Sequence, residues 1–507
     1  MGKNLISLIA SLSLCVALAM PVVSSAQQQK VTHHHYKLID VGTFGGPNTN
    51  FYTLGQASQI LNSRGMAAGA ADTSMLDPNA PNCLSPDCFI SHAFEWQKGS
   101  LTDLGALPGA NSSFGGWINT NGLVAGISGN SEIDPLTGGP ETRAVFWKDG
   151  QINDLRTLGG NESLASAVNN RGQIVGSAAN AIPDPFNTSP FLFGWGTQMH
   201  AFLWQNGEMR DLGTLGGPDS VAGLVNEAGQ VAGISYTSYM PNPANGGAPP
   251  MHPFLWENGK MRDLGTIGGT QVFQLNALNE RGQVVGSMTL ADEDPNHVHP
   301  FLWNGKTLLS LGALGGNEGE ADWLNDAGEV VGHAATPNLC PGGETIDHAF
   351  LWGEGVMSDL GTVPGVDPLM GASGATGINS KTQIVGESNS CDFSIDDAFL
   401  WENGSMTDLN TLIPPDSSMH LFWAVYINDR GEITGFGVLP NGELHTFLLI
   451  PCDESQGWSN CQGSNDLAVA QGESSHKPNV VVPANIRRLL RQRLGSRYHI
   501  PLQSPKR

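Results

Sequence analysis

The residues of this 507-residue chain that could do chemistry recur at regular intervals. A histidine precedes a short apolar run six times, at His92, His200, His252, His299, His348 and His445. An aspartate recurs in a second block, at Asp40, Asp103, Asp154, Asp211, Asp263, Asp359 and Asp408, with Ser310 in one copy. A metal ion needs ligands that converge within about 2.0–2.3 Å, and equivalent positions of successive repeats are rotated apart. We therefore expect structural roles: each histidine bonds a turn carbonyl, and each aspartate is a buried acceptor for backbone N–H groups.

Enzyme motifs are missing from the sequence. It contains no Gly-x-Ser-x-Gly, no His-Glu-x-x-His, no phosphate loop and no dinucleotide fingerprint. The cluster Asp292-Glu293-Asp294 lacks the spacing and the glycine of a calcium loop. We predict no catalytic residue, no metal and no cofactor, although carboxylates brought together from different repeats would escape a sequence search.

Net charge is −23, which excludes nucleic acid as the main partner because phosphate binding needs a basic face. Residues 1–26 have the pattern of a secretory signal: Lys3, an apolar stretch, and small residues up to Ala26. No later run approaches the roughly 20 apolar residues of a membrane helix. We expect an exported protein, extracellular or periplasmic, without a membrane span.

Removal of such a leader would take away Cys15 and leave six cysteines, an even number that favours disulfides in an exported chain. Cys83 and Cys88 share one short segment, and Cys452 and Cys461 bracket another. We predict the pairs Cys83–Cys88, Cys340–Cys391 and Cys452–Cys461. The second pair would join long connections of consecutive repeats.

A third recurring block fixes the architecture. Its asparagine stands at Asn62, Asn119, Asn169, Asn226, Asn279, Asn325, Asn379 and Asn428, and a glycine follows three residues later in every copy except at Thr382. Asn-x-x-Gly between apolar runs predicts a hairpin turn. Each repeat then contains four short strands: A before the asparagine, B after the glycine, C at Phe-Leu-Trp and D at Asp-Leu-Gly.

Four antiparallel strands in about 52 residues match a β-propeller blade. The repeats span residues 36–450, begin with an isolated D strand, Tyr36–Gly42, and end with a C strand, His445–Ile450, that lacks its D. We therefore predict an all-β fold, a closed propeller of about eight four-stranded blades, in which the first D strand completes the last blade. Seven blades plus a separate hairpin is the competing count.

These blocks resemble the HAF family of extracellular repeat proteins, named for a His-Ala-Phe signature. The signature stands literally at His92-Ala93-Phe94, His200-Ala201-Phe202 and His348-Ala349-Phe350. The resemblance covers roughly residues 36–450 and implies a secreted bacterial protein of repeated β units. It implies no particular activity.

Function is expected where the copies differ. In a four-stranded blade the A–B and C–D turns share one face and the long, unrelated B–C connections share the other, and variable loops on a rigid scaffold are usual binding sites. We predict ligand binding at the aromatic residues of two such connections, Phe191, Phe193, Trp195, Tyr236 and Tyr239, unless these rings form a small core of their own. Trp117, Trp323 and Tyr426, in A strands, are candidates to line the central channel or to pack between blades.

The sequence favours a secreted, non-enzymatic binding or scaffold protein with an unknown extracellular ligand, carbohydrate or protein. The alternative is a propeller enzyme, a lyase or glycoside hydrolase, acting on extracellular polysaccharide. Residues 451–485 are predicted to be a polar linker bracketed by cysteines. Residues 486–507 are predicted to be a basic tail with a short helix, and residues 476–507 as a whole contain eight lysines and arginines and no acid.

Overall fold

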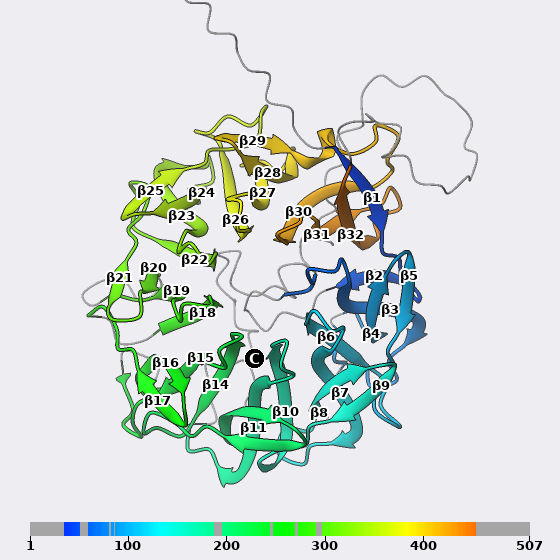
Figure 1. Ribbon diagram of the computed structural model, residues 1–507, viewed down its shortest axis with the longest axis vertical. Coiled ribbons are helices and arrows are strands. Elements are labelled where there is room, and N and C mark those ends of the chain that lie inside the picture. The colour runs from blue at the N-terminus through cyan, green and yellow to red at the C-terminus, as the bar shows by residue number, and fades with distance from the viewer. Residues whose placement is uncertain are drawn as a thin grey trace, which may run out of the picture.

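A computed structural model of the protein describes residues 35–50, 59–80, 83–85, 87–186, 195–243, 247–268, 272–290 and 297–452. Its strands form eight four-stranded antiparallel sheets arranged as blades of one ring (Figure 1). In each blade the A strand lies nearest the centre of the ring and the D strand lies at the rim (Figure 1). The predicted eight-bladed propeller is confirmed.

The strand bounds of the first four blades, numbered along the chain, are as follows. Blade 1 contains β2 (Gly45–Asn50), β3 (Ala67–Leu76), β4 (Phe89–Gln97) and β5 (Ser100–Asp103). Blade 2 contains β6 (Ser113–Ile118), β7 (Val124–Ile133), β8 (Pro140–Lys148) and β9 (Gln151–Asp154). Blade 3 contains β10 (Gly159–Val168), β11 (Ile174–Pro183), β12 (Thr197–Gln205) and β13 (Glu208–Asp211). Blade 4 contains β14 (Ser220–Val225), β15 (Val231–Tyr236), β16 (Met251–Glu257) and β17 (Lys260–Asp263).

The other four blades complete the ring. Blade 5 contains β18 (Val272–Leu278), β19 (Val284–Met288), β20 (His299–Trp303) and β21 (Leu308–Ser310). Blade 6 contains β22 (Gly319–Leu324), β23 (Val330–Leu339), β24 (Thr345–Gly353) and β25 (Val356–Asp359). Blade 7 contains β26 (Gly371–Ile378), β27 (Ile384–Ser390), β28 (Asp396–Glu402) and β29 (Ser405–Asp408), followed by the 3-10 turn Leu409–Thr411. Blade 8 contains β30 (His420–Ile427), β31 (Ile433–Val438), β32 (Leu444–Pro451) and β1 (Tyr36–Asp40).

Blade 8 joins the two ends of the repeat region. Strand β1 pairs antiparallel with β32, from Tyr36 opposite Pro451 to Asp40 opposite Phe447. The Asp40 carboxylate accepts from His445 Nδ1 at 2.8 Å, so the two segments also meet through side chains. The predicted clasp is confirmed, and it leaves no unpaired sheet edge at the junction of the two ends.

The eight recurring asparagines form a closed ring of hydrogen bonds between blades. Each side-chain Nδ2 donates to the backbone carbonyl of the corresponding asparagine in the next blade, at 2.8–3.2 Å. The last bond runs from Asn428 back to the carbonyl of Asn62. All eight side chains are buried. The Oδ1 atoms accept N–H groups of their own turns, as Asn119 does from Asn121 and Leu123.

Each A–B turn ends in a left-handed residue. Seven of these positions are glycine, with φ between 72° and 88° from Gly172 to Gly328, and the eighth is Thr382 with φ 58°. A β-branched residue is strained in this region. The Thr382 hydroxyl donates to Glu329 Oε2 at 2.8 Å, which offsets part of that strain.

The recurring histidine and aspartate bind each other, which corrects the expectation of a turn carbonyl; at His348 both hold, because its Nε2 also lies 3.0 Å from the turn carbonyl of Pro368. Nδ1 of His92, His200, His252, His348 and His445 lies 2.8–3.0 Å from the aspartate of the adjacent D strand. The aspartates also cap the following turn, as Asp103 does for the N–H of Gly105. They are not buried: their side chains are 41–46% exposed.

The His–Asp contact also changes the pKa of the aspartate carboxylates. Burial favours their neutral form, but the histidine hydrogen bond and the turn N–H outweigh it and hold the pKa of Asp211, Asp263 and Asp359 below its ordinary value. These pairs link strands C and D at the rim of a blade, which is a structural role.

Two of the three predicted disulfides lie within the described residues and are confirmed. Cys83–Cys88 closes a short loop of blade 1, with 5.3 Å between the Cα atoms. Cys340–Cys391 joins the B–C connections of blades 6 and 7, with 5.6 Å between the Cα atoms. Cys452 is disulfide-bonded; its predicted partner, Cys461, lies outside the described residues.

The turn geometry predicts a position-specific effect of threonine. Gly172 has φ 72° and no heavy atom within 4 Å of an added Cβ, so Gly172→Thr introduces the backbone strain alone. We expect it to lower the free energy of unfolding by about 1–3 kcal/mol. The matched control, Thr382→Gly, relieves the strain and loses the Glu329 bond, so it should change stability by less than about 0.5 kcal/mol. Urea unfolding measures both, and a neutral Gly172→Thr would contradict the account.

The clasp predicts that a chain beginning at Thr43 is less stable than one beginning at Tyr36. The shorter chain loses the β1–β32 pairing and the Asp40–His445 contact, and it exposes the edge of β32. We expect a lower midpoint of thermal unfolding by calorimetry and concentration-dependent light scattering. Equal midpoints and no association would show that the ring does not depend on β1.

Candidate functional site

The strand order places two kinds of connection on opposite faces of the ring. The A–B and C–D turns lie on one face, called here the turn face, and the B–C and D–A connections lie on the other, called here the loop face. The turns repeat their sequence around the ring, whereas the loop-face connections differ from blade to blade. The search for a site therefore centres on the loop face.

A repeated hydrogen-bond device joins neighbouring blades at the loop face. The hydroxyls of Ser113, Ser163, Ser220 and Ser373 each accept the N–H of an alanine in the C strand of the preceding blade, at 2.9 Å. The residue before this serine varies: it is Ser112 in blade 2, Glu162 in blade 3 and Asp219 in blade 4. The serine hydrogen bond thus holds neighbouring blades together, whereas the residue directly before the serine differs between blades.

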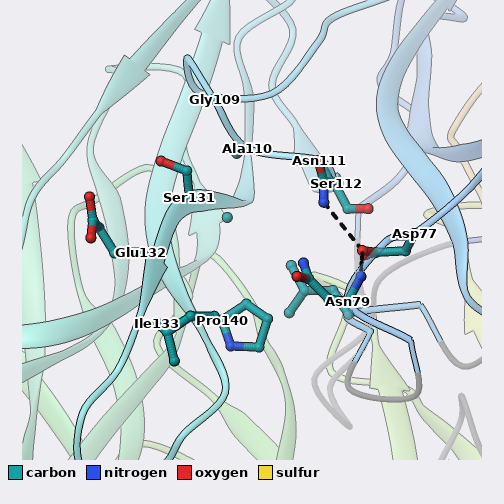
Figure 2. A pocket seen from close by; sticks show the side chains of 12 residues that line it. Asp77, Asn79, Gly109, Ala110, Asn111, Ser112, Ser131, Glu132, Ile133 and Pro140 are labelled. Carbon is teal, nitrogen blue, oxygen red and sulfur yellow. Dashed lines mark hydrogen bonds between the residues drawn. The ribbon is translucent and has the colours of Figure 1, made fainter.

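A pocket of about 200 Å³ lies on the loop face between blades 1 and 2. Its lining comes from three connections: the B–C and D–A connections flanking blade 2 and the B–C connection of blade 1 (Figure 2). One side carries Asp77, Asn79 and Asn111, and the other carries Ile133 and Pro140 together with Ser131 and Glu132 (Figure 2). Such a mixed lining suits a ligand that presents both hydroxyl groups and C–H surfaces.

The wall formed by blade 1 is braced from two sides. The buried carboxylate of Asp77 accepts the N–H of Asn79 at 2.9 Å and the side-chain amide of Asn111 at 3.2 Å (Figure 2). The backbone N–H of Asp77 donates to the carbonyl of Cys88, and the Cys83–Cys88 disulfide closes the loop that brings Leu84 to the pocket. The lining is therefore ordered before any ligand arrives, which lowers the entropy cost of binding.

Behind this pocket, three buried carboxylates gather between blades 2 and 3. Asp134, Glu141 and Glu162 are all under 9% exposed, and Arg143 is their neighbouring cation, 3.2 Å from Glu141. The N–H and the hydroxyl of Thr142 both donate to Glu162 at 2.6 Å. Burial and the charges of Asp134 and Glu141 outweigh these bonds and raise the pKa of Glu162 to about 7.

The same position of the next seam repeats this arrangement. Asp219 is buried and accepts the N–H of Met199 at 2.8 Å. Burial and the charge of Asp184 outweigh that bond and raise the pKa of Asp219 to about 7. Glu162 and Asp219 were not among the predicted site residues; the sequence signal that marks them is an acid directly before the recurring serine.

The predicted aromatic patch is divided by the structure. Phe191 and Phe193 lie outside the described residues. Trp195 and Tyr236 are buried, 5% and 0% exposed, and Tyr236 is the last residue of β15 rather than part of a loop. Tyr239 is 51% exposed and accepts from Gln198 Nε2 at its hydroxyl, at 3.2 Å. Among the described members, Tyr239 is the one with a surface open to a ligand, and the binding role stays a prediction.

A second polar cluster lies inside blade 6, close to the channel. Nδ1 of His333 is 3.2 Å from Asp322, and both side chains are buried. Burial opposes a charge on His333, but the hydrogen bond and charge of Asp322, with Glu320 and Asp347, raise its pKa to about 10. Nearby, the rings of Trp323 and Tyr426 meet edge to face at 5.5 Å, although they belong to blades 6 and 8. Of the three channel candidates, these two meet across the inner edge of blade 7.

The described residues contain no group of three or more His, Cys, Asp and Glu side chains placed to hold a metal ion. Within the same part of the chain, no helix is long and apolar enough to cross a membrane. The three carboxylates between blades 2 and 3 are therefore not placed as a set of metal ligands. Their distinguishing properties are their burial and their negative charge.

No family model matches the chain, and no curated protein matches its sequence. Solved structures do. The β-propeller domain of the Trilobed protease from Pyrococcus furiosus is similar at 10% identity and a TM-score of 0.40, over 74% of this chain and 98% of that one. The acylaminoacyl peptidase of Pyrococcus horikoshii is similar at 11% identity and a TM-score of 0.39, over 79% of this chain and 59% of that one. A polysaccharide lyase of family PL25, an ulvan lyase, has 10% identity and a TM-score of 0.35, over 74% of this chain and 100% of that one.

Glu162 and Asp219 predict a pH dependence of stability. Their pKa of about 7 in the folded protein lies above the ordinary values of 4.5 and 3.8, so the folded state binds more protons than the unfolded state between these limits. The free energy of unfolding therefore falls as pH rises toward 7 and beyond it. We expect a lower urea midpoint at pH 8 than at pH 6, and a smaller difference in the Glu162→Gln, Asp219→Asn double variant. Glu208→Gln, at the exposed first residue of β13, is the control, and an unchanged difference in the double variant would contradict the assignment.

Proposed function

We propose that this protein is an exported, non-enzymatic binding protein that holds an extracellular ligand at its loop face, at the pocket between blades 1 and 2. The observation that carries the proposal is the construction of this pocket. Three connections that escape the repeat converge there, braced by a disulfide and by the Asp77 hydrogen bonds, on a scaffold whose strands and turns repeat. The disulfides support an oxidising compartment, extracellular or periplasmic. Membership of the HAF family is part of the proposal.

The lining favours a carbohydrate group as the ligand. A sugar ring presents hydroxyls at its edge and C–H groups on its faces, and the pocket opposes Asn79 and Asn111 to Ile133 and Pro140. Its volume of about 200 Å³ is below the 300–1,000 Å³ of pockets that enclose drug-sized ligands, so it accommodates one ring or one terminal residue of a larger polymer.

A polysaccharide-cleaving enzyme is the second candidate, and one observation favours it. Glu162 is a buried carboxyl with a pKa of about 7, next to Asp134 and Glu141, and a carboxyl that titrates near neutral pH is what general acid catalysis requires. Glu162 is 3% exposed and binds Thr142, so a substrate would have to enter the seam between blades to reach it.

A binding screen tests the proposal. Residues 27–507 are screened against extracellular polysaccharides and cell-wall polymers, and the affinity of each hit is measured by calorimetry. We expect Asn79→Ala and Ile133→Ala to weaken binding at least tenfold without changing the melting temperature. Val356→Ala is the matched control, because Val356 is equally exposed but lies in β25, on another blade. Tyr239→Ala tests the aromatic patch in the same assay.

Two outcomes would count against this function. Binding that survives both pocket variants would remove the pocket as the site. Release of new reducing ends or of unsaturated products from a hit polymer, lost in Glu162→Gln, would replace the binding protein with the enzyme.

A further inference from the structure

The two faces of the propeller differ in their balance of charge. The turn face carries both signs: basic residues at Arg64, Arg171, Arg281, Lys381, Arg430, Lys98, Lys148, Lys260 and Lys306, and acidic residues that include Glu227, Glu280, Asp326, Asp429, Asp149, Glu208 and Glu354. On the loop face, the described connections contain one basic residue, Arg156, and the neighbouring Arg143, near the start of β8, is paired with Glu141. The loop face therefore has few basic residues to balance its own acidic residues.

Acidic residues are spread around the loop face. They include Asp77 in blade 1, Glu132 in blade 2, Asp184 in blade 3, Glu344 in blade 6 and Asp392 in blade 7. The segments of these connections that fall outside the described residues add Asp292, Glu293 and Asp294 and no basic residue. The loop face thus has a net negative charge spread around the ring, and it attracts cationic partners and repels polyanions.

Two buried carboxylates on this face lack a donor for one oxygen. Asp134 Oδ2 and Asp219 Oδ2 have no hydrogen-bond partner among the described residues, and the two side chains are 0% and 2% exposed. Asp134 directly follows Ile133, a residue of the pocket wall, and its Oδ1 accepts from Asn161 Nδ2 at 3.3 Å. A buried carboxylate oxygen is costly without a donor, and a cation held at this face would reduce that cost.

The chain itself contains a matching polycation. Residues 476–507 include eight lysines and arginines and no acid, against a net charge of −23 for the whole sequence. The described chain leaves the propeller at Cys452, whose N–H donates to the carbonyl of His35. With Cys452 paired to Cys461 as predicted, the 15 residues 462–476 can extend to roughly 50 Å at about 3.3 Å per residue, more than the roughly 33 Å of the ten-residue strand β7. The basic segment can therefore reach the loop face of its own propeller or of a neighbouring copy.

We propose that the loop face binds the basic segment 477–507 of this same protein. Attachment through residues 453–476 of the same chain gives the segment an effective concentration in the millimolar range, so modest charge-based affinity is enough to occupy the face. The segment then competes with any other ligand of the loop face, so such a ligand must bind tightly enough to displace it. This inference shares a surface with the proposed function, but it stands or falls independently of the sugar-binding pocket.

Peptide binding to the shortened chain tests the proposal. A fluorescent peptide of residues 476–507 is titrated with a chain that ends at residue 475, in 50 and 500 mM NaCl. We expect saturable binding that weakens at least tenfold at high salt, because pairing of exposed charges is screened. Glu132→Lys with Glu344→Lys, both exposed on the loop face, should weaken it a further tenfold at low salt. The matched pair Glu208→Lys with Glu354→Lys, on the turn face, makes the same change of charge and should have little effect.

Carboxyl–amine cross-linking of the full chain gives a second readout that needs no variant. We expect Lys477 and Lys506 to link to loop-face acids such as Glu132 and Glu344, and dilution separates links within one copy from links between copies. Absence of peptide binding, equal loss in both double variants, or links confined to the turn face would each overturn the proposal. None of these results bears on glycan binding at the pocket.

Discussion

Eight buried asparagines hold the propeller closed, and the rest of the structure depends on this ring. Each carboxamide is used at both ends: its oxygen accepts N–H groups of its own turn, and its nitrogen donates to the next blade, as Asn169 does to Asn226. Replacement by a residue without both groups would leave several buried polar groups unsatisfied, at about 1–3 kcal/mol each. That is why the asparagine recurs in all eight copies, whereas the glycine three residues later could be replaced by Thr382 at a smaller cost.

Because repeated interactions hold the turn face together, the connections of the loop face can vary in sequence. The asparagine ring and the tight turns set the spacing of the blades, and the serine bonds of the loop face fix the seams, so the connections between them can differ without opening the ring. The pocket beside Asp77, the carboxylates around Glu162 and the excess of acid on the loop face all arise in these connections. The variable segments of the loop face thus supply the polar site, and the repeated strands and turns hold it in position.

The sequence allowed the fold to be predicted because its decisive signals repeat at a regular spacing. The Asn-x-x-Gly turns, the complementary missing strands at Tyr36 and His445, and the Cys83–Cys88 pair can be recognised from spacing, and Cys340–Cys391 is the pair that remains on connections of consecutive repeats. The histidine partner was wrong because it depends on the register of strands C and D, which places His200 beside Asp211. In that position the carboxylate faces the rim and is half exposed.

The site was harder to predict because it is built across seams. Tyr236 was assigned to a loop, and its burial follows from the extension of β15 to that residue, which no repeat specifies. Asp134 follows β7 of blade 2 and Glu162 lies near the start of β10 of blade 3, so their proximity exists in the folded ring and not in any local pattern. Phe191 and Phe193 remain predictions.

The most direct test of the closed ring compares two equivalent junctions. Asn428 bonds the carbonyl of Asn62 across the junction of the chain ends, and Asn226 bonds the carbonyl of Asn279 in the interior of the repeat region, both at 3.1 Å. In a closed ring these bonds are equivalent, so Asn428→Ala and Asn226→Ala should lower the free energy of unfolding by several kcal/mol each and to within about 1 kcal/mol of each other. An Asn428→Ala variant of nearly unchanged stability, beside a destabilised Asn226→Ala, would show that the ring is open at that junction and would contradict the account.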